Sequence, residues 1–245
     1  MEDIIAGRHA VREALQSGRP LNTIYLAASL QPKAAADIAA LARQRRVPVK
    51  KVEKSVLDRL APGAVHQGVI ARAAPYAYAA LPDILAAVQD GDPFLVLLNE
   101  VTDPHNLGAV IRCADAAGAH GVVIPRRRSV AITPAVAKAS AGAVEHVPVA
   151  RVANLARTID WLKRQGIWVV GADQAARQLV WEAPLDGPLA VVVGGEDKGL
   201  GRLVREKCDL LVRLPMAGKI NSLNASVAAA LVMFEAVRQR SRVQE

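Results

Sequence analysis

The feature that most constrains the fold is a series of short, continuously apolar runs between residues 94 and 214. They read FLVLL, GVVI, VEHVPVA, IWVVGA, LAVVV and DLLVRL, and the helical pattern LGAVIRCADAAG lies between the first two. A strand without polar alternation needs apolar cover on both faces, which is typical of a parallel sheet with helices on each side. We therefore expect an α/β domain with a parallel sheet in this part of the chain.

Two of these strands run into loops that are rich in polar residues and glycine. The loop after FLVLL contains Asn106, and Arg112 follows one and a half helical turns later. The loop after LAVVV runs from Gly194 through Glu196 to Gly199. Open parallel sheets bind their ligands where the carboxyl ends of strands pass into helices. Both loops are therefore candidates for the walls of a binding site.

A third loop separates DLLVRL from a long apolar helix. Asn221, Ser222 and Asn224 stand among the four residues that open this helix. Ser and Asn cap helix starts because their side-chain oxygens accept hydrogen bonds from backbone N–H groups that have no other partner. One cap needs only one such residue, so we expect the others to face outward and bind something else. The three polar corners together predict one composite site.

These three segments resemble the SpoU (TrmH-like) family of RNA ribose 2′-O-methyltransferases. The residues that carry the resemblance are Asn99, Pro104, His105, Asn106, Gly108 and Arg112 in the first segment, Gly194, Glu196, Gly199 and Leu200 in the second, and Pro215, Met216, Gly218, Ser222, Leu223 and Asn224 in the third. The resemblance implies a deep trefoil knot near the C-terminus. It also implies the cofactor S-adenosyl-L-methionine, which the knot would hold in a bent conformation.

The N-terminal part alternates short helical and strand patterns. Its segments GRHAVREAL and HQG are similar to the substrate-binding domain that precedes the catalytic domain in the 23S rRNA guanosine-2′-O-methyltransferases of this family. We therefore expect a small α/β substrate-binding domain of a ribosomal-protein type over residues 1–74, a linker over 75–91, and the methyltransferase domain over 92–245.

The resemblance also implies roles for individual residues. The catalytic set would be Asn106, Arg112, Glu196, Ser222 and Asn224, and the backbone of Gly194, Leu214 and Leu223 would contact S-adenosyl-L-methionine. A guanidinium group hardly ever loses its proton in proteins. We therefore expect Arg112 to grip the phosphate of the target nucleotide and to stabilise the developing alkoxide, rather than to act as the base.

Charge favours a polyanionic partner. The chain has a net charge of +8, and residues 1–75 hold 12 Lys and Arg against 6 Asp and Glu. Basic proteins are drawn to nucleic acids because phosphate contacts release counterions. The aromatic content of 3% argues against a surface of stacked rings. We expect RNA contacts at Arg8 and His9 in GRHAVREAL, and at Arg126, Arg127 and Arg128 after GVVI.

Other residues exclude several alternatives. Cys113 and Cys208 have apolar neighbours, which indicates free buried thiols. The histidines show no metal-ligand spacing, so no metal site is expected. The start MEDIIAGRH is acidic where a signal peptide needs basic residues, and the longest uncharged apolar run, 227–234, is too short to span a bilayer. We therefore expect a cytoplasmic protein.

Two alternatives stay open beside 2′-O-methylation of a guanosine in 23S rRNA. One is the same reaction on a tRNA guanosine, and the other is a non-catalytic, ribosome-associated RNA-binding protein. The N-terminal domain favours rRNA, and the intact motif residues argue against the non-catalytic protein. The C-terminal helix is apolar around much of its circumference, which predicts a homodimer through this domain.

Overall fold

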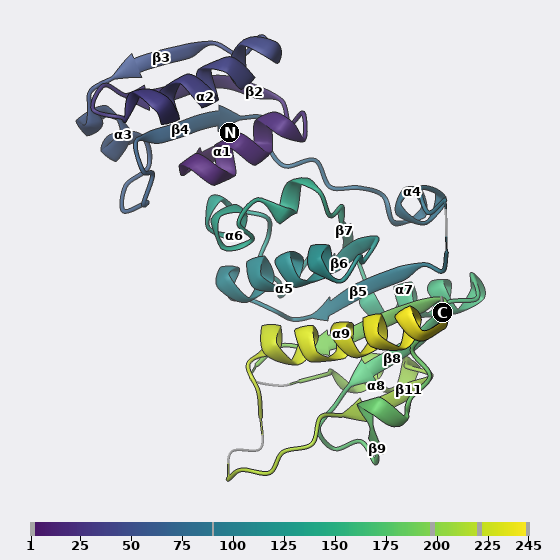
Figure 1. Cartoon of the computed structure of the whole chain (residues 1–245). Coiled ribbons are helices and arrows are strands. Elements are labelled where there is room, and N and C mark those ends of the chain that lie inside the picture. The colour runs from purple at the N-terminus through teal and green to yellow at the C-terminus, as the bar shows by residue number, and fades with distance from the viewer. Residues whose placement is uncertain (1–2, 90, 197–198, 220–221, 244–245) are drawn as a thin grey trace. The chain divides into compact units, whose positions relative to one another are not determined.

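The computed structural model describes residues 3–89, 91–196, 199–219 and 222–243. The chain forms two compact units, and each has its own sheet (Figure 1). The N-terminal unit comprises residues 1–77 together with 132–146, and the second unit comprises 78–131 together with 147–245. The segment 132–146 therefore leaves the second unit and packs into the first.

The N-terminal unit is a four-stranded mixed sheet with helices. Its strands occur in the order β1 (Asp3–Ala6), β4 (Val69–Ala73), β2 (Leu21–Ala27) and β3 (Val49–Val52). Only the pair β2–β3 is parallel. The helices are α1 (Arg8–Gln16), α2 (Pro32–Gln44), α3 (Lys54–Leu60) and, from the returning segment, α6 (Pro134–Ala139) and the 3₁₀ turn η1 (Ala143–Glu145).

The returning segment is tied to the N-terminal unit by ion pairs. Arg19 Nη1 donates to Glu145 Oε1 at 2.7 Å, and both side chains are only 8% exposed. Arg19 also pairs with Asp3 at 2.9 Å, and His146 Nε2 lies 3.0 Å from Glu13 Oε2. Because one buried guanidinium serves two carboxylates from distant parts of the chain, it fixes both to the same side of the unit.

The second unit contains a seven-stranded, wholly parallel sheet. Its order is β7 (Val149–Val152), β6 (Gly121–Pro125), β5 (Phe94–Asn99), β10 (Leu189–Gly194), β8 (Trp168–Ala172), β11 (Leu210–Arg213) and β9 (Gln178–Leu179). The β5 and β10 residues are all buried except Gly194, which is half-buried. This confirms the parallel sheet that the apolar runs predict.

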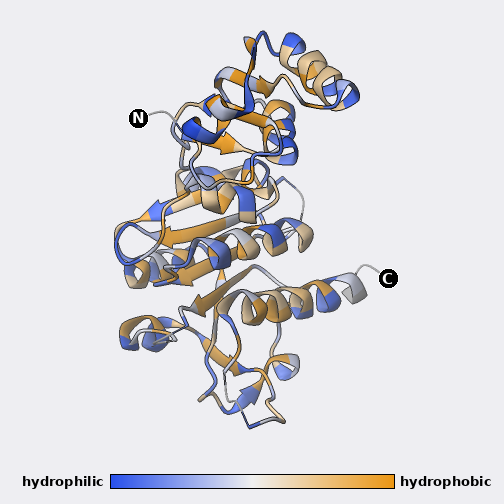
Figure 2. Ribbon diagram, turned by 90° about the vertical axis from the view of Figure 1, so that its left-hand side faces the viewer, coloured by the Kyte–Doolittle hydropathy of each residue, from blue (hydrophilic) through white to orange (hydrophobic). Residues whose placement is uncertain are grey.

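Helices cover both faces of this sheet. On one face, α5 (Pro104–Ala116) and α9 (Ala225–Val243) lie side by side (Figure 1). On the other face, α4 (Leu81–Ala86), α7 (Leu155–Arg164) and α8 (Arg202–Lys207) share a core with alternate strand residues. The strands are mostly hydrophobic along their length, whereas the helices carry both classes of side chain (Figure 2). The result is a three-layer α/β/α arrangement.

Three details differ from the sequence prediction. The run VEHVPVA, residues 144–150, is predicted to be one strand, but only its last two residues belong to β7. Its first two residues belong to the 3₁₀ turn Ala143–Glu145 of the other unit. The strands β1 and β9 have no counterpart in the prediction. Helix α5 begins at Pro104, so Asn106 lies in its first turn and not in the preceding loop. The trefoil knot and the boundaries 1–74, 75–91 and 92–245 stay predictions.

Candidate active site

The first two polar loops meet because their strands are neighbours. Strands β5 and β10 pair in register, with Asn99 opposite Gly194 at their carboxyl ends. The N–H of Gly195 donates to the carbonyl oxygen of Asn99 at 2.8 Å, and Asn99 Nδ2 donates to the Gly199 carbonyl at 3.3 Å. These bonds hold the loop after β10 against the loop after β5.

Glycine is required where the second loop folds back on itself. A Cβ on Gly194 would lie 2.6 Å from the Cα of Gly199 and closer still to its carbonyl group. A Cβ on Gly195 would overlap the carbonyl oxygen of Glu100. Backbone therefore meets backbone at this corner, with no room for a side chain at either position.

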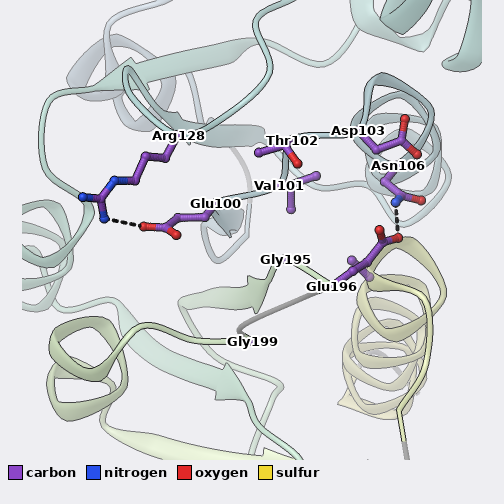
Figure 3. A pocket seen from close by; sticks show the side chains of 10 residues that line it. Glu100, Val101, Thr102, Asp103, Asn106, Arg128, Gly195, Glu196 and Gly199 are labelled. Carbon is purple, nitrogen blue, oxygen red and sulfur yellow. Dashed lines mark hydrogen bonds and ion pairs between the residues drawn. The ribbon is translucent and has the colours of Figure 1, made fainter.

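A cavity of about 330 Å³, which we call the Asn106 cavity, opens at this corner (Figure 3). It is lined by Glu100, Val101, Thr102, Asp103, Asn106, Arg128, Gly195, Glu196, Gly199 and Ala225. Asn106 points toward Glu196 from α5, and Arg128 reaches Glu100 at 3.2 Å (Figure 3). The cavity therefore combines polar groups from three distant segments.

Three of the predicted catalytic residues form one hydrogen-bond network. Asn106 Nδ2 donates to Glu196 Oε1. Asn224 Nδ2 donates to Asn106 Oδ1 at 2.9 Å and to Glu196 Oε1 at 2.8 Å. The two amides therefore both donate to the same carboxylate oxygen. A carboxylate has a second oxygen and further lone pairs, so Glu196 can still accept a proton or a hydrogen bond from a ligand.

Asn224 also caps the last helix. Its Oδ1 accepts from the backbone N–H groups of Ser226 at 2.9 Å and Val227 at 3.3 Å, and from Ser226 Oγ at 2.6 Å. Asn224 therefore both caps α9 and takes part in the hydrogen-bond network with Asn106 and Glu196. Asn221 lies outside the described residues.

A second cavity of about 220 Å³, the Leu214 cavity, adjoins the first. It is lined by Ala172, Asp173, Gln174, Val193, Gly194, Gly195, Glu196, Gly199, Val212, Leu214, Ser222, Leu223, Ala225 and Ala228. All three positions predicted to contact S-adenosyl-L-methionine, Gly194, Leu214 and Leu223, are among them. Gln174 Nε2 donates to the Leu214 carbonyl at 3.0 Å and so orients the strand end.

The lining of the Leu214 cavity fits S-adenosyl-L-methionine. Valine and leucine side chains offer an apolar wall for adenine, and the glycine corner exposes backbone groups that can approach the base and ribose closely. Asp173 adds a carboxylate that can accept from ribose or ammonium groups. The two cavities share Glu196 and its neighbouring glycines. A methyl donor bound in one cavity would therefore face a methyl acceptor bound in the other.

Ser222 and Arg112 occupy different places from the network. Ser222 is exposed and lines the Leu214 cavity. Arg112 is also exposed, but it lines neither cavity. Arg112 is six positions after Asn106 on the same helix, and at about 100° per residue this turns its side chain about 120° away from that of Asn106. A single chain therefore does not bring Arg112 to the network.

The predicted RNA-binding arginines and His9 are exposed. Arg128 also lines the Asn106 cavity, whereas Arg126 and Arg127 do not. In the N-terminal unit, Arg8 lines a third cavity, and His9 is its neighbour at the start of α1. The prediction that these residues contact RNA stays a prediction.

Among the charged and amide residues that line the two cavities, sequence reasoning assigned no role to Glu100, Asp103, Asp173 or Gln174. Glu100 has a backbone φ of 60°, which side-chain-bearing residues rarely adopt and which often marks functional sites. Asp103 caps α5 by accepting from the His105 N–H at 3.0 Å. A capping Asp before Pro is a recognisable sequence signal, whereas the other three carry none.

Other features of the described chain bear on its chemistry. Cys113 and Cys208 are free and half-buried. Burial, reinforced by the neighbouring Asp209, raises the pKa of the Cys208 thiol to about 12, which keeps it protonated and unreactive at neutral pH. Among the described residues, no three His, Cys, Asp or Glu side chains gather as metal ligands. No helix within this described part combines the length and hydropathy that crossing a bilayer requires.

Comparison with known proteins identifies the family of this chain. A model of the SpoU rRNA methylase family matches residues 93–234, and a model described as RNA 2′-O ribose methyltransferase substrate binding matches residues 4–79. A Bacillus subtilis protein assigned to the TrmH family of tRNA/rRNA methyltransferases is 49% identical over 245 residues, which cover 99% of this chain and 98% of the relative.

Two solved structures are similar over almost the whole chain. The SpoU methyltransferase AviRb from Streptomyces viridochromogenes, in complex with S-adenosylmethionine, matches with a TM-score of 0.85 and 29% identity, covering 98% of this chain and 91% of AviRb. An S-adenosylmethionine-bound rRNA methyltransferase from Sinorhizobium meliloti matches with a TM-score of 0.80 and 26% identity, covering 97% of this chain and 87% of that protein. The chain thus belongs to the SpoU family of RNA ribose 2′-O-methyltransferases, which use S-adenosyl-L-methionine.

Proposed function

We propose that this enzyme methylates the ribose 2′-OH of a guanosine in 23S rRNA. The observation that carries the proposal is the position of Glu196, whose carboxylate lies where the two cavities meet. We place S-adenosyl-L-methionine in the Leu214 cavity and the target ribose in the Asn106 cavity. When bound, the cofactor supplies a methyl group that is already activated by a positively charged sulfur.

The chain's own residues must align the hydroxyl and accept its proton. Alignment alone can lower the barrier by several kcal/mol, and a positioned base adds about 10²- to 10⁴-fold. Asn224 fixes the amide of Asn106, and both donate to Glu196 Oε1. Glu196 Oε2 and Asn106 Oδ1 are then the acceptors that we place beside the ribose hydroxyl. Ser222, on the wall of the Leu214 cavity, would orient the backbone beside the donor.

Ribosomal RNA is favoured over tRNA by the N-terminal unit. The Sinorhizobium meliloti structure, which is named as an rRNA methyltransferase, matches 97% of this chain and therefore also includes that unit. The Bacillus subtilis relative is named for both tRNA and rRNA, so tRNA is the second candidate substrate. The non-catalytic alternative is disfavoured because the chain belongs to a family of methyltransferases and holds Asn106, Glu196 and Asn224 in one network between the two cavities.

The direct test is methylation of total RNA with radiolabelled donor, followed by mapping of the modified ribose. We expect one 2′-O-methylguanosine in 23S rRNA. Label in tRNA alone would move the assignment to the second substrate. Failure of the wild-type protein to bind S-adenosyl-L-methionine in calorimetry would contradict the placement of the donor.

Arg112→Ala should retain donor binding and lose turnover. If the guanidinium stabilises the developing alkoxide, its loss should lower kcat by about 10²- to 10³-fold, as for one oxyanion-hole donor. Arg202→Ala is the matched control, because that arginine is 85% exposed on α8 and pairs with Glu206 at the surface. Unchanged turnover in Arg112→Ala would remove Arg112 from the mechanism.

We also propose that the enzyme is a homodimer through its C-terminal domain. Helix α9 exposes Val227, Leu231 and Phe234, each 47% accessible, at a spacing that lines them up on one face. The exposed position of Arg112 is consistent with this assembly, because a second copy could bring it to a site that its own chain does not reach.

Phe234→Glu should convert the dimer into monomers. A carboxylate in a buried apolar interface is costly to desolvate, so association should fail at micromolar concentration. Light scattering of the wild-type and variant proteins measures the change. Leu203→Glu is the control, since Leu203 is 60% exposed on α8, away from this stripe. A wild-type protein that is monomeric under these conditions would rule out the proposed dimer.

A further inference from the structure

The N-terminal unit contains a third cavity of about 540 Å³, which we call the His66 cavity. It is larger than either cavity of the catalytic unit and has no part in the site described above. Four separate segments line it: the start of α1, the turn after β2, α3, and the loop 64–68. Its volume lies in the range of about 300–1,000 Å³ that ligand pockets occupy.

The loop 64–68 is held in one shape by a buried histidine. His66 is 5% exposed, its Nδ1 accepts from the Gly68 N–H at 3.0 Å, and its Nε2 donates to Asp58 Oδ1 at 2.9 Å. This pair of bonds clamps the loop to α3. The clamp keeps Gln67 at a backbone φ of 51°, which non-glycine residues rarely adopt. Backbone strain of this kind persists only where the surroundings impose it, and it concentrates at ligand sites.

The clamped loop presents a distinctive set of side chains. Val65 and Gln67 flank His66, and both are exposed; Val65 is 61% accessible. Gln31 faces the same cavity from the turn after β2, and Arg8 and Lys54 line it from the starts of α1 and α3. The cavity therefore combines an apolar patch, two primary amides and two cations.

This combination matches the parts of one nucleotide. A primary amide can donate to and accept from a base edge, an aliphatic patch and a guanidinium plane can cover the base face, and cations neutralise the adjoining phosphates. The carboxylate of Asp58 also lines the cavity, but it is engaged by His66. Bases within an A-form duplex are out of reach of side chains in the deep major groove, so side chains that read a base edge from within a pocket suit an unpaired nucleotide.

We propose that the His66 cavity binds one unpaired nucleotide of the RNA substrate, at a position distinct from the methylated residue. This inference rests on the proposed function, since it takes RNA as the substrate. Gln67 and Gln31 read the edge of the base, Val65 and Arg8 cover its face, and Lys54 holds a neighbouring phosphate. The nucleotide so held anchors the RNA while its target ribose is at the catalytic site.

Gln67→Gly tests the cavity without disturbing the loop, because glycine adopts the positive φ of this position at no steric cost. The probe is an unmodified transcript that spans the nucleotide methylated by the wild-type enzyme. We expect the KM for this RNA to rise about 10-fold, in line with the loss of one base-reading side chain. The turnover number and the affinity for S-adenosyl-L-methionine should stay unchanged.

Arg46→Gly is the matched control. Arg46 is also exposed, also has a positive φ (57°), belongs to the same unit and does not line the cavity. Its KM should stay within about twofold of wild type, because a single phosphate contact is the most that it can lose. Chemical probing of the transcript should show an unpaired nucleotide that is protected by the wild-type and Arg46→Gly proteins but exposed with Gln67→Gly.

Other outcomes separate this inference from the proposed function. A wild-type KM and unchanged protection in Gln67→Gly, with methylation intact, would overturn the inference alone. If the wild-type enzyme methylates tRNA instead, the same comparison is made on that tRNA. If it methylates no RNA, the proposed function fails, and filter binding of 23S rRNA to the wild-type and Gln67→Gly proteins still tests the cavity. Binding of a free mononucleotide without any effect on RNA affinity would overturn the inference in favour of a small ligand.

Discussion

Gly194→Ala should weaken the binding of S-adenosyl-L-methionine by about 10- to 100-fold, because forcing an extra methyl group into a packed site typically costs about 1–3 kcal/mol, and about 1.4 kcal/mol is tenfold in affinity. The added methyl group would overlap the backbone of Gly199, and backbone cannot rotate away as a flexible side chain can. The loop after β10 must therefore move, and that loop lines both cavities. Calorimetry with the donor alone measures the effect in the absence of RNA.

The control for this substitution is Gly187→Ala. A Cβ at Gly187 would meet no atom within 4 Å, and Gly187 precedes β10 at the opposite end of the strand from the site. It should bind donor as the wild-type protein does. Circular dichroism should show that both variants are folded. Donor affinity within about threefold of wild type in Gly194→Ala would mean that the loop yields easily, and the donor would then not depend on this corner.

Glu196→Ala should lower kcat by about 10²- to 10⁴-fold, which is the contribution of a positioned proton acceptor. The loss has two physical sources. The substitution removes the carboxylate from the junction of the cavities, and it leaves the amides of Asn106 and Asn224 without their common acceptor. Single-turnover methylation of the mapped RNA fragment measures the effect on the chemical step.

Glu196→Gln distinguishes the two sources. Its side-chain oxygen can still accept from both amides, but the group has no negative charge and cannot take a proton at neutral pH. If Glu196 acts as the base, the Glu196→Gln variant should methylate RNA as slowly as Glu196→Ala. If Glu196 only orients Asn106, Glu196→Gln should recover much of the methylation rate. Glu206→Ala, at an exposed pair on α8, should match the wild-type enzyme. Wild-type turnover in Glu196→Ala would exclude both roles.

Much of the catalytic unit follows from local sequence. The apolar runs of β5 and β10 need cover on both faces, and this alone indicates a parallel sheet. The strand β9 escaped prediction because it has only two residues. The strand β1 escaped because its four residues, DIIA, show no distinctive periodicity. The segment 132–146 could not be assigned to the other unit, because no local pattern records which core a helix joins.

For the site, the sequence by itself determined which residues stand in polar loops or helix starts next to apolar runs: Asn106, Glu196 and Asn224. Only the tertiary structure decided that these three meet. The strand order β5–β10–β8–β11 and the packing of α9 against α5 bring together side chains that are 28 to 118 residues apart.

The tertiary structure also separated Arg112 from Asn106, which the sequence places only six residues away. One physical reason explains both the meeting of Asn106, Glu196 and Asn224 and the separation of Arg112 from Asn106. Spacing along a chain determines the phase of a side chain within its own helix or strand, whereas contacts between elements depend on which faces pack together. Which faces pack together depends on the burial of whole apolar surfaces, and no single motif encodes it.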